Sequence, residues 1–329
     1  MSDSSARSPV DSVALVGPGR AGTALALALA SRGVRTTAVA GRAADAPSTR
    51  EVALRLDAPA VTVPEAGRSA DLIVVATPDG AIETAAAALA ASLEPGALVV
   101  HLAGARGLDA LAPISATRTD VLVGALHPLQ TLPSADAGAA RLAGAWAAIA
   151  GPPRVEALAR FLDLRPFGVA DADRAAYHAA ACVAANHLVA LLSQVERIAA
   201  AAHVPLEAFE PLVSATVDNV FAFGPSSALT GPVARGDTDT VARHLDSLAP
   251  DDRDAYLALA DTARRLAGID DSALRALLAS EPGGGGFADR RRRSRSLRRR
   301  PMEPGGGGFA DRRRRSRSLR RRPMEAQPA

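Results

Sequence analysis

The sequence of 329 residues predicts an α/β fold: a doubly wound, mostly parallel sheet, followed by a smaller all-helical domain and a disordered tail rich in arginine and glycine. Three observations lead to this prediction. Short apolar runs alternate with helical patterns up to residue 171, no strand pattern follows them, and an exact 22-residue duplication fills most of the end of the chain. We therefore divide the chain into a disordered N-terminus (1–11), an α/β domain (12–171), a helical domain (172–280) and the tail (281–329).

The first predicted strand leads into a glycine-rich turn and then into an Ala/Leu-rich helix. Val13–Val16 is an apolar run typical of a strand buried on both faces. The turn that follows has the pattern G-x-G-x-x-G, in which the glycines turn the chain, admit a pyrophosphate and pack the helix on the sheet. Because the pattern stands between a strand and a helix, it predicts a dinucleotide site rather than a merely structural turn. The residues of this site are Gly17, Pro18, Gly19, Arg20, Ala21 and Gly22.

The end of the second predicted strand indicates which dinucleotide to expect. Residues 34–40 form this strand, and Gly41 and Arg42 follow it. A site selective for NAD has an acidic residue about 20 positions beyond the glycines, whereas an arginine accommodates the 2′-phosphate of NADP. No carboxylate appears here before Asp45, so Arg42 favours NADP. The alternative is that Arg42 is a solvated loop charge.

The remaining strands of the sheet are expected at 60–63, from residue 70 onward, and at 96–101, 121–126, 145–150 and 166–170, with a helix at about 153–164. Ligands of such a sheet bind beyond the carboxyl ends of its strands. Thr77 and Pro78 are therefore expected to border the cofactor. His127 and Gln130 follow the 121–126 strand and are expected beside the substrate in the same cleft.

One long helix is expected over residues 173–202, and it carries the sharpest polar pattern of the chain. His178, Cys182 and Asn186 are spaced at i, i+4 and i+8, so they share one face. His178 is the candidate general acid that protonates the product as hydride reaches carbon, and Asn186 would hold the carbonyl oxygen. On spacing alone, a hydrogen-bonded histidine between domains is the favoured interpretation of His178.

The loop at 228–237 is a second candidate site in the helical domain. Arg235 is expected to bind a substrate carboxylate bidentately, with Thr230 nearby, although pairing with a neighbouring acid explains this arginine equally well. Further helices are expected at about 205–223, at 238–248 (capped by Asp237), at 252–267 (capped by Asp251) and at 270–279. The histidines and the cysteine show no metal-ligand spacing, so we predict no metal.

Composition places the protein in a broad class. Residues 1–280 carry a net charge of −8, which argues against a nucleic-acid interface on the folded body. Cys182 is the only cysteine, so no intrachain disulfide is possible and a reducing compartment is expected. The N-terminus lacks the apolar core of a signal peptide, and uninterrupted apolar runs are too short for a membrane span. We therefore expect a soluble cytoplasmic protein.

The tail differs from the body in charge and composition. Residues 281–302 recur unchanged as 303–324, with four glycines and eight arginines in each copy, and the tail carries a net charge of +11. Such a composition predicts disorder. Binding to nucleic acid or anionic lipid is one interpretation. A recent tandem duplication without function is favoured over it, because no aromatic residues are interleaved for base stacking.

Six motifs occur together in one order along the chain: 17–22, 71–78, 101–105 (His-Leu-Ala-Gly-Ala), 126–131 (Leu-His-Pro-Leu-Gln-Thr), 177–180 (Tyr-His-Ala-Ala) and 228–237. In these motifs the chain closely resembles the Rossmann-like oxidoreductases whose helical C-terminal half is known only as a domain of unknown function. That family is similar to pyrroline-5-carboxylate reductase, to 6-phosphogluconate and β-hydroxyacid dehydrogenases, and to ketopantoate reductase. The resemblance implies an NADP-binding domain and a helical domain that closes the cleft and forms a homodimer.

The chain departs from these relatives in one respect. The β-hydroxyacid dehydrogenases and ketopantoate reductases use a catalytic lysine, and this sequence contains no lysine. Histidine is then the natural acid, and His178 is preferred to His127. We therefore expect an NADPH-dependent reductase of a small carbonyl compound, most concretely a 2-oxo acid such as ketopantoate. The alternatives are an imine or pyrroline-type reductase and a non-catalytic NADP-binding sensor or scaffold.

Overall fold

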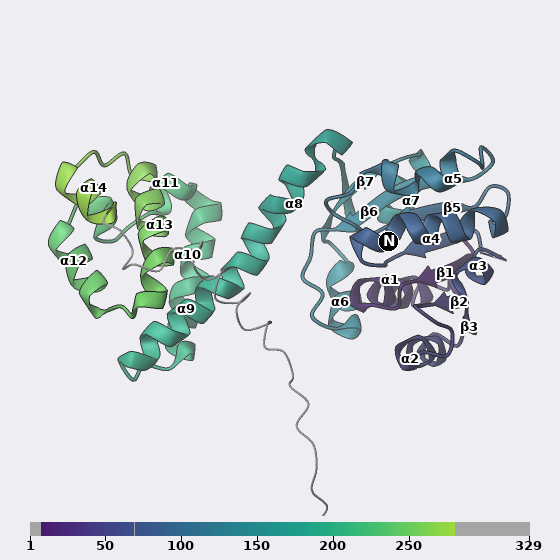
Figure 1. The fold of residues 1–329 in the computed structure, drawn as a ribbon, viewed down its shortest axis with the longest axis horizontal. Helices are drawn as coiled ribbons and strands as arrows, with labels where there is room; N and C mark the ends of the chain where they lie inside the picture. The colour runs from purple at the N-terminus through teal and green to yellow at the C-terminus, as the bar shows by residue number, and fades with distance from the viewer. Residues whose placement is uncertain (1–7, 69, 280–329) are drawn as a thin grey trace, which may run out of the picture. The chain divides into compact units, whose positions relative to one another are not determined.

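The computed structural model describes residues 8–68 and 70–279, which belong to two compact units that divide between Arg197 and Ile198 (Figure 1). The predicted domain boundary, at residue 171, does not coincide with this division; it marks the place where the helical part of the chain begins. The division lies inside a helix because the chain is helical from Arg174 to Ala201. The predicted tail lies outside the described residues.

The first unit is built on one sheet of eight strands in the order β3-β2-β1-β4-β5-β6-β7-β8. The strands are β1 (Ser12–Val16), β2 (Arg35–Ala40), β3 (Ala60–Val61), β4 (Leu72–Val75), β5 (Leu98–His101), β6 (Leu122–Pro128), β7 (Trp146–Ala150) and β8 (Arg165–Gly168). All neighbouring pairs are parallel except β6 and β7, which are antiparallel. The sheet confirms the predicted doubly wound, mostly parallel fold.

Helices cover both faces of this sheet because the central strands are apolar on both sides. In β1, Val13 and Leu15 belong to the core on one face, and Ala14 and Val16 belong to the core on the other. The first core includes side chains of α1 (Arg20–Ala30), α2 (Pro47–Arg55), α6 (Ala135–Leu142) and α7 (Pro153–Phe161). The second includes side chains of α3 (Val63–Ala66), α4 (Ile82–Leu89) and α5 (Ala112–Ser115). Figure 1 shows α1 and α6 side by side, and they are in contact.

The helical part of the chain begins with α8 (Arg174–Cys182), continues through a π-helical turn (Val183–His187) and ends with α9 (Leu188–Ala201). The later helices are α10 (Glu210–Phe223), α11 (Pro225–Ala228), α12 (Thr238–Ser247), α13 (Pro250–Leu266) and α14 (Ser272–Leu278). Among the described residues after 171 there is no strand, as predicted. A small core holds α12, α13 and α14 together through Val241, Leu245, Ala260, Leu274 and Leu278.

Two helix starts compare differently with the sequence expectation. The Asp237 carboxylate accepts a hydrogen bond from the Thr240 amide at 3.0 Å, so this residue caps α12 as predicted. The prediction that Asp251 caps the next helix is wrong, because that helix already begins at Pro250, whose fixed φ suits the first helical position. Asp251 therefore lies in the first turn, where its charge favours the helix dipole.

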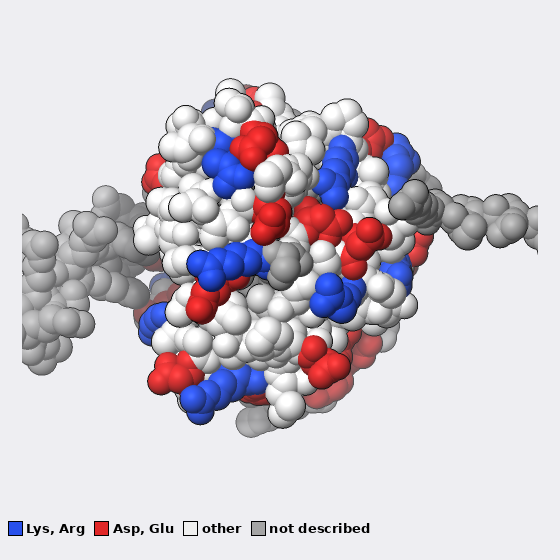
Figure 2. All heavy atoms as spheres, turned by 90° about the vertical axis from the view of Figure 1, so that its right-hand side faces the viewer, with Lys and Arg blue, Asp and Glu red and all other residues white. Residues whose placement is uncertain are grey.

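The surface of the first unit and the long helix bear on the choice of partners. On the face drawn in Figure 2, arginine side chains alternate with acidic ones and form no stripe of one sign. The helical segment 171–201 is long and apolar enough to cross a membrane by length and composition alone, although the apolar stretches are interrupted by polar residues. Helices that pack against protein have the same length and composition. In this segment Tyr177 and His178 contact His127 of β6.

Candidate functional site

The turn between β1 and α1 is held by backbone hydrogen bonds, and its glycines let the backbone pack closely against β4. The Gly17 amide donates to the Ala40 carbonyl at 2.8 Å, which fixes the turn to the end of β2. Gly17 has a φ of +94°, and a Cβ there would lie 2.6 Å from the backbone of Ala76. A Cβ on Gly22 would lie 2.6 Å from the Ala76 Cβ, so this glycine lets α1 pack on the strand end.

The start of α1 is left open toward solvent. Gly19 is the residue before the helix, no side chain caps the helix, and no acidic residue lies in its first turn. A Cβ on Gly19 would meet nothing within 4 Å. Free amide groups at a helix start bind anions, and an open glycine lets a phosphate approach them. The turn therefore offers a pyrophosphate-sized anion site.

This turn forms one wall of a cleft of about 950 Å³, which is at the upper end of the range for small-molecule sites. Most of the predicted cofactor and substrate residues line this cleft: Gly17, Pro18, Gly19, Arg20, Ala21, Arg42, Thr77, Pro78, His127 and Gln130. Gly22 lies behind the cleft, where α1 packs on the sheet. Two residues of this lining suggest where a dinucleotide would lie. Arg42 follows β2, and the Thr77 hydroxyl, beyond β4, is buried without a hydrogen-bond partner in the part of the chain that the structure describes.

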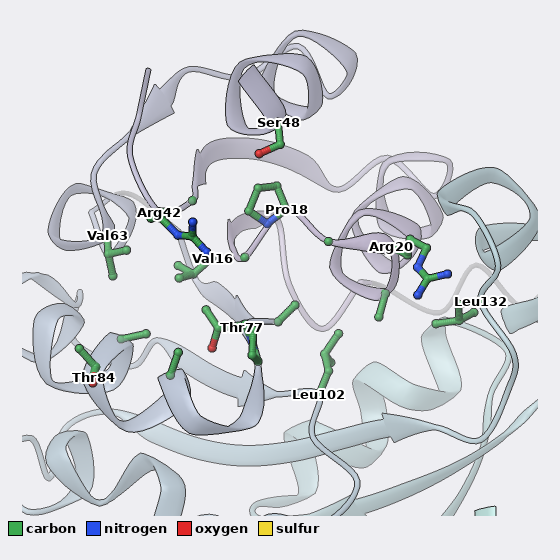
Figure 3. Close-up of a pocket in the computed structure, with 18 of the residues that line it drawn as sticks. Val16, Pro18, Arg20, Arg42, Ser48, Val63, Thr77, Thr84, Leu102 and Leu132 are labelled. Carbon is green, nitrogen blue, oxygen red and sulfur yellow. The ribbon is translucent and has the colours of Figure 1, made fainter. Parts of the chain in front are cut away.

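Figure 3 shows Arg42 near Val16 and Pro18, on the side of the cleft that faces α2. Ser48 of α2 also lines the cleft, and its hydroxyl points toward Pro18 in this view. A cation and a hydroxyl group close to the end of β2 are the groups expected around a 2′-phosphate on the adenosine ribose. The residues present therefore fit a phosphorylated dinucleotide. No sequence pattern indicated Ser48, because its place in the cleft depends on the way α2 packs over β2.

The other part of the cleft is occupied by His127, at the carboxyl end of β6. Its Nδ1 atom lies 2.7 Å from the Tyr177 hydroxyl of α8, and the two rings meet edge to face with centroids 5.6 Å apart. Burial is the main cause that lowers the pKa of His127 to about 4, and the nearby positive charges of His178 and Arg174 lower it further. His127 is therefore neutral at pH 7.

His178 lies against His127, with ring centroids 5.6 Å apart, and both rings pack on Gly104 in the loop after β5. A Cβ on this glycine would lie 2.4 Å from the His178 Nδ1 atom and 2.9 Å from the His127 Nε2 atom. The Nδ1 atom of His178 is buried and has no hydrogen-bond partner within residues 8–68 and 70–279, and its Nε2 atom lies 3.7 Å from the Cys182 sulfur. His178 thus supports the wall behind His127 and does not line the cleft itself.

His101, at the end of β5, holds the loop that carries Gly104. It is fully buried, its Nε2 donates to the Gly107 carbonyl at 3.0 Å, and its Nδ1 accepts from the Ala103 amide at 3.2 Å. With both nitrogens paired in this way the ring is neutral, and burial lowers its pKa to about 4. We assign His101 a structural role.

The remaining predicted residues lie elsewhere. Asn186 is exposed and belongs to the π-helical turn, which interrupts the i, i+4, i+8 spacing that placed it with His178. The structure brings His178 to Cys182 but gives no contact between either of them and Asn186. Thr230 and Arg235 are exposed and belong to the second unit. The role of these three residues stays a prediction.

Sequence reasoning did not single out Gly104, Tyr177 or Arg174 as functional residues. Gly104 and Tyr177 stood only within longer motifs, and Arg174 belonged to none of the motifs. Their positions follow from a tertiary contact between α8 and the strand ends, which are separated by 50 residues between His127 and Tyr177. The one available signal was that Tyr177 stands next to the candidate His178 in the motif 177–180.

Comparisons with known proteins agree with this architecture. A model of a Rossmann-like domain matches residues 1–128, and a model of the domain of unknown function DUF2520 matches residues 147–263. No curated protein matches the chain.

Several solved structures are similar in fold. A "putative NADP oxidoreductase" from Bacteroides fragilis is 24% identical with a TM-score of 0.66, and the match covers 78% of this chain and 99% of that one. A protein from Thermotoga maritima is 22% identical with a TM-score of 0.59, covering 78% and 98%. A reductive aminase from Aspergillus terreus, in complex with NADPH and ethyl levulinate, is 16% identical with a TM-score of 0.50. The match covers 87% of this chain and 94% of that one.

At these identities the solved structures show the fold alone. The two domain models add that residues 1–128 are similar to a Rossmann-like domain and residues 147–263 to the domain of unknown function DUF2520.

Proposed function

We propose that the protein is an NADPH-dependent oxidoreductase that transfers a hydride to a small carbonyl compound. One observation carries the proposal: the glycine turn before α1 and His127 line the same cleft. An anion site for a dinucleotide and a proton-donating side chain are thereby brought to one cavity, which is what hydride transfer to a carbonyl requires. The name of the Bacteroides fragilis structure and the NADPH of the reductive aminase complexes support the choice of cofactor.

In this proposal the chain holds the cofactor at three places. The amides at the start of α1 bind the pyrophosphate, Arg42 binds the 2′-phosphate, and Thr77 and Pro78 border the nicotinamide half. When bound, NADPH supplies the hydride. The absence of any acidic side chain among the residues that line the cleft favours NADP over NAD.

His127 and His178 differ in their access to the cleft. His127 lines the cleft, so it is the group that faces the substrate oxygen, and His178 packs behind it. We therefore propose His127, in place of our first candidate His178, as the residue that touches the substrate. Asn186 remains a candidate for holding the carbonyl oxygen.

For the substrate we propose a 2-oxo acid of the ketopantoate type, with Arg235 and Thr230 as candidates for binding its carboxylate and Gln130 for binding in the cleft. An imine is the second candidate, because the fold is similar to that of a reductive aminase. A protein that binds NADPH without turnover is the third.

We also propose a cytoplasmic homodimer that forms through the helical part. Exposed apolar side chains support the dimer: Val189 of α9 is 69% exposed, and Leu212 and Phe221 of α10 are 63% and 87% exposed. Exposed apolar surface of this kind marks protein interfaces. Analytical ultracentrifugation of the full chain measures whether the dimer exists in solution.

Stopped-flow absorbance at the nicotinamide band tests the proposed reaction. The full chain is mixed with NADPH and a panel of 2-oxo acids, and then with the same panel plus ammonia or small amines. Oxidation with the acids alone supports a carbonyl reductase, and oxidation only with amines supports an imine reductase. If NADPH binds and no compound oxidises it, the proposed reaction is wrong and a sensor or scaffold remains.

A further inference from the structure

The inference concerns Tyr177, which contacts His127 and does not line the cleft. The Tyr177 hydroxyl has one hydrogen-bond partner among the described residues, the His127 Nδ1 atom at 2.7 Å. The ring is held from its other side by Phe167 of β8, whose centroid lies 5.8 Å away in an edge-to-face contact. Both the position and the partner of the hydroxyl are therefore fixed by packing.

The direction of this hydrogen bond follows from the protonation states of the two groups. Burial raises the pKa of Tyr177 above its ordinary value, so the hydroxyl keeps its proton. His127 is neutral because its pKa is about 4. If the hydroxyl donates to Nδ1, its proton is satisfied, and the proton of the imidazole ring must then lie on Nε2. Nε2 is the nitrogen that reaches the loop at Gly104.

Arg174 supplies a positive charge beside this pair. Its side chain is fully buried, and its one ion pair among the described residues is an Nε contact of 3.3 Å with Asp171, which is half exposed. The two terminal nitrogens, Nη1 and Nη2, have no partner among the described residues. A buried guanidinium with so few partners is costly, and such groups are retained where they serve a function. Its charge lowers the pKa of Tyr177, in opposition to burial.

We propose that Tyr177 is a positioning residue that fixes the tautomer of His127 and resupplies its proton, and that Arg174 stabilises the tyrosinate formed when it does so. This inference rests on the proposed function, because it assigns the source of the proton that the product receives. Tyr177 acts only through His127, which is the group that faces the substrate.

The transfer balances in protons and electrons. The hydride adds to the carbonyl carbon, and the electron pair of the carbonyl double bond moves to oxygen, which becomes an alkoxide. The alkoxide takes the proton from the Nε2 atom of His127. The Nδ1 atom takes the proton of the Tyr177 hydroxyl in the same step, so the ring stays neutral and a tyrosinate remains near Arg174. Solvent returns a proton to Tyr177, which is partly exposed.

The energetics favour this route over donation by His127 alone. An alkoxide is roughly as basic as hydroxide and far more basic than a tyrosinate, because tyrosine has an ordinary pKa of about 10. Transfer of a proton from tyrosine to the alkoxide is therefore favourable. A neutral imidazole that donated without being resupplied would become an anion in a buried site, which is far less stable.

The charged and titratable groups around His127 come from two other elements. His101 lies on β5, and Arg174, Tyr177 and His178 lie on α8. Positive charge on His101, Arg174 or His178 lowers the pKa of His127, and none of these groups is an acid that could hold the ring as imidazolium. The tautomer therefore depends on the hydroxyl of Tyr177.

Nitrogen-15 NMR of the histidine rings in the full chain tests the positioning role without any substrate. We expect His127 to carry its proton on Nε2 in the wild-type protein, and the Tyr177→Phe variant to lose this tautomer preference while its fold is kept. The matched control is Tyr256→Phe, because the Tyr256 hydroxyl also bonds a histidine, His244, at 2.8 Å in the second unit. This control should leave His127 unchanged.

Arg174 is tested through the tyrosine that it stabilises. The chain has two tyrosines, so in the Tyr256→Phe background the tyrosinate absorbance reports on Tyr177 alone. Adding Arg174→Gln should raise the pH at which this absorbance appears, and Arg174→Lys should restore it because it keeps the charge. Circular dichroism at each pH restricts the comparison to folded protein.

Single-turnover oxidation of NADPH by ketopantoate then tests the proton transfer. We expect Tyr177→Phe and Arg174→Gln each to slow it, the first by about 100-fold, which is the lower end for a positioned acid. The inference is overturned if His127 carries its proton on Nδ1. It is also overturned if Tyr177→Phe leaves both the tautomer of His127 and the pH dependence of the single-turnover rate as in the wild type. The tautomer result needs no turnover, so it decides the positioning role separately from the proposed function.

Discussion

Gly104 is the residue on which the two histidines of the site pack. The lack of a side chain at this position lets the His127 and His178 rings approach the loop after β5. Its role comes from space alone, because its φ is not among the positive values that require glycine. The sequence motif around it contained the glycine but could not indicate this contact, since the two rings come from β6 and α8.

Gly104→Ala should therefore displace both rings. The added Cβ would lie 2.4 Å from the His178 Nδ1 atom, a separation that forces the neighbours to move. We expect a loss of about 1–3 kcal/mol in the free energy of unfolding, which is typical of overpacking, and a slower single turnover. Gly168→Ala is the control, since its Cβ would meet nothing within 4 Å. Equal stability and turnover of the two variants would contradict the packing role.

Arg42 is the residue that selects between the two nicotinamide dinucleotides in this proposal. Arg42→Ala should raise the Kd for NADPH by about 10- to 100-fold, as expected for the loss of a charged hydrogen bond. The Kd for NADH should change little, because NADH lacks the 2′-phosphate. Fluorescence titration of the nicotinamide measures both. Arg35→Ala is the control, because Arg35 begins β2 at the end away from the cleft. An equal loss for both cofactors would show that Arg42 does not read the 2′-phosphate.

At the scale of the elements, the sequence predicted the sheet better than it predicted the site. Apolar runs such as Val13–Val16 and Leu72–Val75 are buried on both faces, and burial is what makes a strand visible in a sequence. The β1–α1 turn was predictable because its glycines perform local tasks. The contact between His127 and Tyr177 was not, because it depends on how α8 lies across strand ends that are distant in the sequence.

The helix starts in the second unit follow the same rule of local causes. Asp271 caps α14 through a hydrogen bond of 2.7 Å from the Leu274 amide to its carboxylate. Helix α14 brings Leu274 and Leu278 into the small core of this unit. The prediction for Asp251 failed because the helix begins at Pro250, two residues earlier than expected.

Asp271→Ala should loosen α14. Loss of a helix cap costs about 1 kcal/mol, so amide hydrogen exchange in α14 should speed up by roughly five-fold relative to wild type. Asp271→Asn keeps an oxygen that can accept the Leu274 amide and serves as the control. If the alanine and asparagine variants exchange at the same rate, the cap does not stabilise this helix.

At the scale of the whole molecule, two neutral histidines, His101 (buried) and His127 (half-buried), make the protein sensitive to acid. His101 and His127 both have a pKa of about 4 when folded, below the ordinary value of 6.5. The unfolded chain binds protons first as the pH falls, so stability declines from about pH 6.5 to about pH 4 and then levels off. Each histidine contributes at most about 3 kcal/mol to this decline.

Urea unfolding between pH 4 and 8 measures the effect. We expect His127→Gln to reduce the loss of unfolding free energy between pH 6.5 and 4. Substitution of His187, which is exposed, should leave this loss unchanged. A His127→Gln variant with the same pH dependence as the wild type would show that this ring is not held neutral by the fold.

The whole account depends on a dinucleotide that binds in the cleft between the β1–α1 turn and His127. Isothermal titration calorimetry of the full chain with NADPH, NADP, NADH and NAD tests this most directly. We predict saturable binding of NADPH, with weaker binding of NADH. The account is contradicted if none of the four nucleotides produces a binding signal.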